Sequence, residues 1–311
     1  MRGVGLDDFG GPDVLHVVEL AMPEPGAGEV RVRVAAATVN PTDTLFRSGR
    51  QRARMADMPP PYVPGMEFAG TVDAAGPGVE LADGARVMGL MQPRTPRGGA
   101  QAEYIVASAQ SLVPIPDGVG FAQAATVPMN GLTAVMAVEA VGVAPGEAVL
   151  VTGAAGAVGG YCVQLAHAAG MTVLADASER DEELVHSLRA HEIFRRGPEL
   201  AAAVRAQRPG GADGLIDAAL MGPVVYPAVK DGRNVVTLRL SPPEPAGRVH
   251  VHYVSVTEQA HNTAALQKLA GLVADGTLTP RVAQCLPMQD ARRAHELLEA
   301  GGIRGRLVLT F

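Results

Sequence analysis

Residues 149–181 read VLVTGAAGAVGGYCVQLAHAAGMTVLADASERD, and this stretch decides the fold class. It opens within an apolar run, residues 148–153, that is typical of a buried strand. Residues 161–170 are typical of a helix that Gly170 ends, and residues 172–177 are typical of a second strand. A strand, a helix and a strand in this order indicate a parallel sheet with helices on both faces.

The turn between the first strand and the helix, TGAAGAVGG, consists mainly of small residues. Its spacing, Ala154-x-Gly156-x-x-Gly159, lets the backbone approach a pyrophosphate, which the free N–H groups at the helix start would face. Gly159 would also let the helix and the strand pack closely. An ordinary tight turn is the alternative, but the flanking strand, helix and strand favour a dinucleotide site. The predicted phosphate contacts are Gly153, Ala154, Ala155, Gly156, Ala157, Val158 and Gly159.

The end of the second strand bears on the choice between NAD and NADP. Asp176 stands where an acidic side chain often accepts hydrogen bonds from the ribose hydroxyls and selects NAD, although it could equally be a turn or capping carboxylate. Ser178 and Arg180 offer a hydroxyl and a fixed cation to a 2′-phosphate, unless Arg180 is only a solvated side chain paired with a neighbouring acid. Arg195 and Arg196 add positive charge after the third strand. We therefore expect NADPH as the cofactor, with contacts from Ser178, Arg180 and Arg196.

Composition excludes a nucleic-acid partner. The chain has 311 residues, which is enough for two compact domains. Its 26 Lys and Arg residues against 32 Asp and Glu residues leave a net charge of -6, so a basic face for a phosphate backbone is not expected. Aromatic residues are 4% of the chain and Trp is absent, which leaves little material for stacking on bases.

Cysteine use and hydropathy favour a cytoplasmic protein without a membrane span. Cys162 and Cys285 can build neither a disulfide framework nor a C-x-x-C metal site. The beginning of the chain lacks the apolar core of a secretory signal. Residues 119–138 are uncharged, but Pro128 and Gly131 interrupt them and alanine dominates over leucine.

The chain predicts two domains, one inserted in the other. Residues 1–120 read as short strands between turns, with Val and Arg alternating over 30–34 as in a half-buried strand. Residues 121–246 alternate helices and strands. Residues 247–311 change texture again and contain a strand, two helices and a closing strand, so we expect them to return to the first domain.

Four ordered motifs carry a family resemblance: NPTDTLFRSG at 40–49, PPPYVPGMEFAGTVDAAGPGV at 59–79, GLTA at 131–134 and GGIRGRLVL at 301–309. With the glycine-rich turn, they make the sequence resemble the zinc-free quinone oxidoreductase branch of the medium-chain dehydrogenase/reductase superfamily over nearly its whole length. The resemblance implies an α/β fold in which a Rossmann domain, a doubly wound parallel sheet, is inserted in a GroES-like β-barrel domain. It also implies NADPH in the cleft and, since relatives are commonly dimers, a homodimer.

Zinc ligands expected in the zinc-dependent relatives are missing. Met66 stands where those relatives carry His, no Cys lies near 40–42, and no cysteine-rich lobe follows residue 90. A thioether is a poor zinc ligand without thiolates and imidazoles beside it, so we expect no metal. Glu67 then has a more plausible role as an anchor of the barrel backbone than as a base. His250 and His252 share one face of a strand but lack a third ligand.

The same resemblance places Asn40 and Thr133 near the nicotinamide and its ribose. Asn40 and Tyr62, which lies in a proline-rich loop, are the candidate catalytic residues, with packing of Tyr62 and a proton from solvent as the alternatives. Without zinc as a Lewis acid, activated acceptors are favoured, so the expected reaction is hydride transfer from NADPH to quinones or α,β-unsaturated carbonyls. The alternatives are an enoyl reductase dedicated to one biosynthetic intermediate, or a non-catalytic NADPH-binding sensor or structural protein.

Overall fold

The structure, a computed structural model, describes residues 1–238 and 247–311. The chain divides into two compact units. We call one the terminal unit; it comprises Met1–Met129, Thr257–Ala274 and Pro280–Phe311. The other is the central unit, which comprises Asn130–Val256 and Asp275–Thr279.

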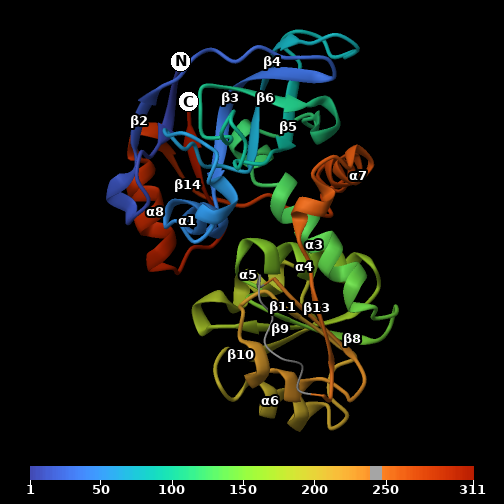
Figure 1. Ribbon diagram of the computed structural model, residues 1–311. Coiled ribbons are helices and arrows are strands. Elements are labelled where there is room, and N and C mark those ends of the chain that lie inside the picture. Colours follow the sequence, from blue (N-terminus) through green and yellow to red (C-terminus); the bar gives the residue numbers. More distant parts are fainter. Residues whose placement is uncertain (239–246) are drawn as a thin grey trace. The chain divides into compact units, whose positions relative to one another are not determined.

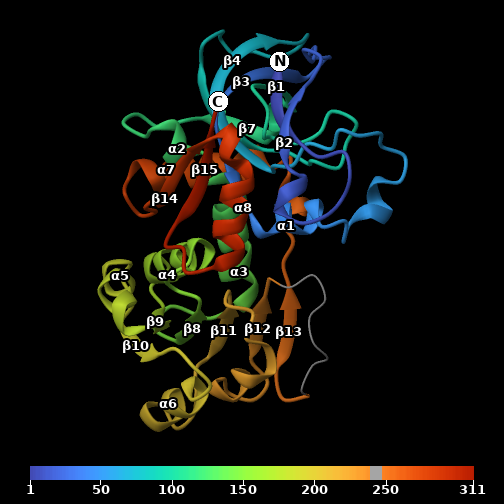
Figure 2. The same ribbon diagram turned by 90° about the vertical axis from the view of Figure 1, so that its left-hand side faces the viewer.

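Six parallel strands form one sheet in the central unit, in the order β10-β9-β8-β11-β12-β13 (Figure 2). The strand order reverses direction between β8 and β11, which is the switch point of a doubly wound sheet. The Rossmann sheet predicted from the sequence is therefore confirmed. The strands are β8 (Ala148–Thr152), β9 (Thr172–Ala177), β10 (Glu192–Arg195), β11 (Gly214–Asp217), β12 (Asn234–Thr237) and β13 (His250–Tyr253).

Helices cover this sheet because its central strands are apolar on both faces. All five residues of β8 are buried. The helix after β8 ends where Gly170 takes a positive φ of 76°, a conformation that glycine adopts without strain. The helices of this part of the chain are α3 (Pro128–Val141), α4 (Ala157–Ala168), α5 (Glu182–Ser187) and α6 (Leu200–Gln207).

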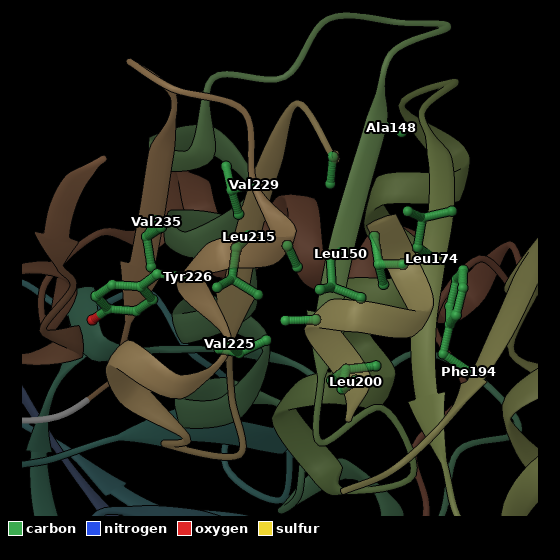
Figure 3. Close-up of a cluster of buried hydrophobic side chains, with 14 of the residues drawn as sticks. Ala148, Leu150, Leu174, Phe194, Leu200, Leu215, Val225, Tyr226, Val229 and Val235 are labelled. Atoms are coloured by element: carbon green, nitrogen blue, oxygen red, sulfur yellow. The ribbon is translucent and has the colours of Figure 1, made fainter. Parts of the chain in front are cut away.

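One core of the central unit lies between the sheet and α6. Leu150, Leu174 and Leu215 come from three neighbouring strands and point toward the side on which Leu200 lies (Figure 3). All four side chains are at most 1% exposed. This packing fixes the strands whose carboxyl ends carry the turn described below.

The terminal unit contains a sheet built from both ends of the chain, in the order β14-β15-β3-β4-β5-β7, with β6 paired to β3 (Figure 1). The pairing of β15 with β3 joins the last strand to an early one, as expected of a GroES-like domain. A separate hairpin pairs β1 with β2. The strands are β1 (Arg2–Gly5), β2 (His16–Glu19), β3 (Glu29–Val39), β4 (Glu67–Ala75), β5 (Arg86–Leu90), β6 (Tyr104–Ser108), β7 (Leu112–Pro114), β14 (Val282–Pro287) and β15 (Arg306–Thr310).

The alternation predicted for the first long strand is confirmed. Val30, Val32 and Val34 in β3 are at most 3% exposed and join the core of the unit, whereas Arg31 and Arg33 face outward. Helix α3 begins in this unit. The other α-helices described in the unit are α1 (Pro41–Arg47), α2 (Phe121–Ala124), α7 (Thr263–Ala274) and α8 (Ala291–Ala300).

The last part of the chain differs from the sequence prediction. Residues 247–311 were expected to return together to the first domain, but β13 pairs in parallel with β12 in the central sheet. The alternation of Val and His in β13 did not indicate which sheet the strand joins, because an edge strand does not need two apolar faces. The predicted boundary at residue 246 lies outside the described residues, and the spans 1–120, 121–246 and 247–311 stay predictions as domain limits.

Residues 121–141 are long and apolar enough for a membrane span by composition. In the structure they form α2 and α3 with a break between them, and 67% of the most apolar window is buried inside the protein. Core helices of globular proteins pass the same test, so this segment is weak evidence for a membrane.

Candidate functional site

The glycine-rich turn lies at the carboxyl end of β8. Gly153 takes a positive φ of 67°, and its carbonyl accepts a 2.8 Å hydrogen bond from the N–H of Gly156, which precedes the first residue of α4. A Cβ at position 159 would lie 2.2 Å from the carbonyl oxygen of Gly153. Only glycine therefore permits this contact between the helix and the strand, as the sequence spacing predicted.

The first turn of α4 presents backbone donors. Helix geometry gives the N–H groups of Ala157, Val158 and Gly159 no partner within the helix. Gly156, Ala157 and Val158 are partly exposed, and the N-cap residue, Gly156, has no side chain to cap the helix. The positive end of the helix dipole lies at the same place. This arrangement suits an anionic group such as a phosphate.

Asp217 holds the turn from the neighbouring strand. This buried carboxylate, at the end of β11, accepts hydrogen bonds from the Thr152 hydroxyl at 2.7 Å and from the N–H groups of Met221 at 3.0 Å and Gly222 at 2.7 Å. The Thr152 hydroxyl in turn accepts from the N–H of Ala219 at 3.1 Å. Sequence reasoning missed Asp217, whose only signal is an acid placed directly at the end of a predicted strand.

The Asp176 carboxylate is buried, and its hydrogen bonds are made within the protein. Its side chain is 0% exposed and accepts a 3.2 Å hydrogen bond from the N–H of Ala154 in the turn. It also accepts from Arg196, at 2.9 Å from Nε and 3.3 Å from Nη2. Asp176 therefore has the contacts of a turn carboxylate, which was the alternative considered from the sequence.

Three polar residues predicted to bind a 2′-phosphate lie at the ends of β9 and β10. The Arg196 side chain is 36% exposed while Asp176 holds two of its nitrogens, so its direction is set from within. The Ser178 hydroxyl donates to Asp181. Arg180 is exposed and makes no ion pair within the described part of the chain. Arg195, by contrast, pairs with Glu179 at 3.0 Å.

A second polar cluster is buried in the terminal unit around Glu67. One carboxylate oxygen accepts from the Thr38 hydroxyl at 2.6 Å and the Asn40 amide at 3.3 Å, and the other accepts from the N–H of Met129 at 2.9 Å. Arg306 approaches the first oxygen at 3.6 Å. Burial raises the pKa of Glu67, and the positive charge of Arg306 acts in the opposite direction. The backbone hydrogen bond of Glu67 is thus made to α3, and its expected role as an anchor of the barrel backbone stays a prediction.

Asn40 is part of this cluster. Its amide nitrogen donates to Thr38 at 2.9 Å as well as to Glu67, and its amide oxygen accepts from Arg306. Both amide hydrogens are thus occupied within the protein. Contact of Asn40 with a nicotinamide stays a prediction, and Arg306, 266 residues away along the chain, was not foreseen as its partner.

Asp43 joins the cluster to the start of α1. Its carboxylate accepts from the N–H of Asn40 at 2.7 Å and from the N–H of Gly65 at 3.0 Å. Burial raises the pKa of Asp43 to about 7, although these two hydrogen bonds favour the charged form. Asp43 therefore links the loop before α1 to the loop before β4.

The two remaining predicted site residues are Tyr62 and Thr133. The Tyr62 hydroxyl donates to the carbonyl of Met58 at 3.0 Å, and its ring stacks on Phe9 with 4.9 Å between ring centroids. These contacts are those of the packed loop residue considered as the alternative, and a catalytic role of Tyr62 stays a prediction. Thr133 lies in α3 and is half-buried, and it has interactions of its own.

Comparison with known proteins identifies the family. A model of the alcohol dehydrogenase GroES-like domain matches residues 26–117, and a model described as zinc-binding dehydrogenase matches residues 188–309. Quinone oxidoreductase of Rattus norvegicus is 28% identical over 329 residues, which cover 99% of this chain and 97% of that protein. A solved structure of an NAD-dependent alcohol dehydrogenase is 31% identical, with both chains covered fully and a TM-score of 0.89. The chain belongs to the quinone oxidoreductase branch of the medium-chain dehydrogenase/reductase superfamily.

Members of this superfamily differ in their cofactor, as two neighbours show. The neighbour just named is described as NAD-dependent, whereas a mycobacterial protein was solved in complex with NADPH. The latter is 28% identical, with 100% of both chains covered and a TM-score of 0.86. This chain is an oxidoreductase of the quinone oxidoreductase type.

The name of the second family model raises the question of zinc. Met66 is 2% exposed and stands directly before Glu67, and the nearby Asn40 contributes an amide. Over residues 1–238 and 247–311, the structure brings no three His, Cys, Asp or Glu side chains together in a way that could hold a metal ion. His252 instead hydrogen-bonds Asn234 at 3.0 Å. A zinc ion does not fit these donor atoms.

Proposed function

We propose that this oxidoreductase reduces quinones or α,β-unsaturated carbonyl compounds with NADPH and without zinc. The observation that carries the choice of NADPH is the Arg196 guanidinium, which the buried Asp176 holds at the end of β10. A cation whose direction is set in advance recognises a phosphate at little cost in side-chain entropy. The NADPH complex of the mycobacterial neighbour supports the same choice.

The remaining contacts follow from the turn and its surroundings. We propose that the turn from Gly153 to Gly159 binds the pyrophosphate and that the N–H groups of Ala157, Val158 and Gly159, at the start of α4, are its donors. Ser178 and Arg180 would join Arg196 at the 2′-phosphate. Thr133 and Asn40 remain the proposed residues near the nicotinamide end.

Bound NADPH would supply a hydride, which together with one proton converts a quinone to a hydroquinone or an enone to a saturated ketone, with NADP⁺ as the other product. The protein's own part is to hold the polar groups around Glu67 in place. Asn40 hydrogen-bonds both Glu67 and Arg306, and Arg306 lies 3.6 Å from Glu67, so none of the three presents itself as an obligatory proton donor. We propose that solvent delivers the proton.

Zinc independence rests on the donor set. Met66 and Asn40 occupy the positions where zinc-dependent relatives carry ligands, and neither offers the thiolate or imidazole that zinc prefers. Substrates must then be activated by their own electron-poor double bond. Plain alcohols and ketones are therefore expected to be poor substrates.

Assays with NADPH and NADH against simple quinones, alkenals, enones and alcohols test the proposal. We expect kcat/KM to be at least about tenfold higher with NADPH, since a phosphate–arginine contact contributes about 1.5–3 kcal/mol. Equal use of NADH would contradict the cofactor assignment. Strong preference for one elaborate enone would indicate the dedicated enoyl reductase instead, and tight NADPH binding without turnover would indicate the sensor.

We further propose a cytoplasmic homodimer without a membrane or nucleic-acid partner, as the family resemblance and the charge of the chain suggest. Light scattering coupled to size-exclusion chromatography measures the mass directly. A mass of one chain, 32.1 kDa, across the working concentration range would contradict the dimer.

A further inference from the structure

The turn after α1 concentrates positive charge in an acidic protein. Residues 48–54 read SGRQRAR, and Arg50, Arg52 and Arg54 are exposed. Arg47, just before them, pairs with Glu299 in α8. Arg54 has no such carboxylate partner within residues 1–238 and 247–311. The charge at the end of this turn is therefore uncompensated.

Arg94, in the loop after β5, faces this turn. Its Nη1 donates to the side-chain oxygen of Gln51 at 2.8 Å, and its Nη2 donates to the side-chain oxygen of Gln92 at 2.9 Å. Both acceptors are neutral amides. They set the direction of the guanidinium without cancelling its charge, and no described carboxylate pairs with Arg94.

Gln92 adds a donor at the same place. Its oxygen accepts from Arg94, so its amide nitrogen lies close to the guanidinium. This nitrogen is buried and has no hydrogen-bond partner among residues 1–238 and 247–311. A buried donor without an acceptor lowers stability unless a ligand supplies one.

The positive charge of Arg54, in the turn after α1, acts on Arg94. The pKa of Arg94 is lowered first by burial and then by this charge. Arg94 and the unpaired amide of Gln92 thus lie side by side, and no carboxylate of the described residues pairs with Arg94. Such a group of donors is suited to bind an oxyanion, which would accept hydrogen bonds and reduce the repulsion.

This group of donors, which we call the Arg94 cluster (Gln51, Arg54, Gln92, Arg94), is connected to the buried Glu67 cluster through two short elements of the terminal unit. Leu90, two residues before Gln92, is paired with Glu67 across β5 and β4. The turn that carries Gln51 and Arg54 follows α1, whose preceding residue is Asn40.

We propose that Arg54, Gln92 and Arg94 bind a carboxylate or phosphate group carried by the substrate, so that the electron-poor alkene or quinone reduced by this enzyme is an anion. The inference rests on the proposed function, because it names the class of acceptor that this function takes. It predicts discrimination between acceptors that react at the same double bond and differ only in a remote negative charge.

Two matched pairs of acceptors test this and distinguish the two anions. The first is a p-benzoquinone that carries a 4-carboxybutyl chain and its methyl ester, and the second is the same quinone with a 4-phosphonooxybutyl chain and the corresponding 4-hydroxybutyl alcohol. We expect the KM of the anionic member to be at least about tenfold lower in one pair or both. Preference in the first pair alone assigns a carboxylate, and preference in the second alone assigns a phosphate.

Variants connect the preference to these residues. Arg94→Gln and, independently, Arg54→Gln should bring the KM ratio within each pair close to one; Arg54→Gln removes an exposed side chain and so guards against a folding defect. Arg33→Gln, which removes the same charge from an exposed position in β3, should keep the ratio. Equal KM values in both pairs for the unaltered enzyme, or a ratio that survives in both variants, overturns the proposal.

Binding of inorganic pyrophosphate and of succinate separates this inference from the proposed function. One of these anions should raise the Tm of the unaltered protein more than that of Arg94→Gln or Arg54→Gln, whether or not any acceptor is reduced. Binding at the glycine-rich turn would contribute equally to all three proteins. The same Tm shift in all three contradicts the anion site, while absence of turnover with every acceptor contradicts the proposed function alone.

Discussion

At the scale of single residues, the site depends on where charges are compensated. Asp176 and Arg196 form a pair in which the acid is fully buried and the base is partly exposed. The acid accepts from the turn as well, so a change at the cofactor phosphate would be transmitted to the glycine-rich turn through one side chain. Arg180 lies nearby without such an anchor.

Replacement of Arg180 by alanine tests the phosphate contact. We expect the KM for NADPH to rise about tenfold or more and the KM for NADH to change less than about twofold, because only NADPH carries the 2′-phosphate. Steady-state kinetics with a simple quinone measures both. Arg195→Ala is the matched control, because Arg195 forms an ion pair with Glu179. This variant should leave the ratio of the two KM values unchanged. Equal losses with both cofactors in Arg180→Ala would sink the assignment.

At the scale of elements, β8, the turn and α4 behave as one unit because the helix touches the turn at Gly159. A methyl group there would meet a backbone carbonyl, which cannot swing aside as a side chain can. Replacement of Gly159 by alanine should therefore lower the free energy of unfolding by about 1–3 kcal/mol and weaken NADPH binding. Urea unfolding and fluorescence titration with NADPH are the measurements.

Gly271, inside α7, provides the control for this variant. An added Cβ there meets no atom within 4 Å. Gly271→Ala should raise stability by about 0.5–1 kcal/mol, as expected for alanine in a helix interior, and should leave NADPH binding alone. Similar losses in both variants would contradict the close packing of the turn.

Helix α8 carries a buried histidine that makes the stability depend on pH. Within the described part of the chain, neither ring nitrogen of His295 has a hydrogen-bond partner, and burial, with the nearby charge of Arg47, lowers its pKa to about 3. The unfolded chain, with a pKa near 6.5, binds a proton first as the pH falls. The contribution of His295 to stability is therefore fully present above pH 6.5 and is lost progressively from pH 6.5 to about 3.

Replacement of His295 by leucine tests this directly. The unaltered protein should lose about 2 kcal/mol more stability than His295→Leu between pH 7 and pH 5, since only its unfolded state gains a proton at this residue. Urea unfolding at several pH values gives both curves. Parallel curves would show that His295 does not titrate differently in the two states.

At the scale of the whole molecule, the proposed zinc independence predicts that metal does not affect activity, because no three His, Cys, Asp or Glu side chains of residues 1–238 and 247–311 lie together as metal ligands. Prolonged exposure to a chelator and addition of zinc should each leave kcat/KM with NADPH and a quinone unchanged. Metal analysis of the purified protein should find zinc well below one ion per chain. A zinc-dependent alcohol dehydrogenase treated alongside must lose activity, and inactivation of this protein by the chelator would overturn the proposal.

Much of the fold was predictable because its signals are local. The strand around Val30 and Val34, the apolar run of β8 and the end of α4 at Gly170 each depend on neighbours within a few positions. The place of β13 was not predictable in this way. An edge strand with alternating polar residues looks the same in either sheet, and only its pairing with β12 decides.

By itself the sequence determined the class of the protein: a strand, a small-residue turn and a helix that suit a dinucleotide. Only the tertiary structure decided what the polar residues do. Asp176 became an internal anchor through Arg196, 20 residues later, and Asn40 was occupied by Arg306, 266 residues later. Local patterns depend on backbone geometry, whereas the role of a charged side chain depends on which partner the folded chain brings within hydrogen-bonding distance.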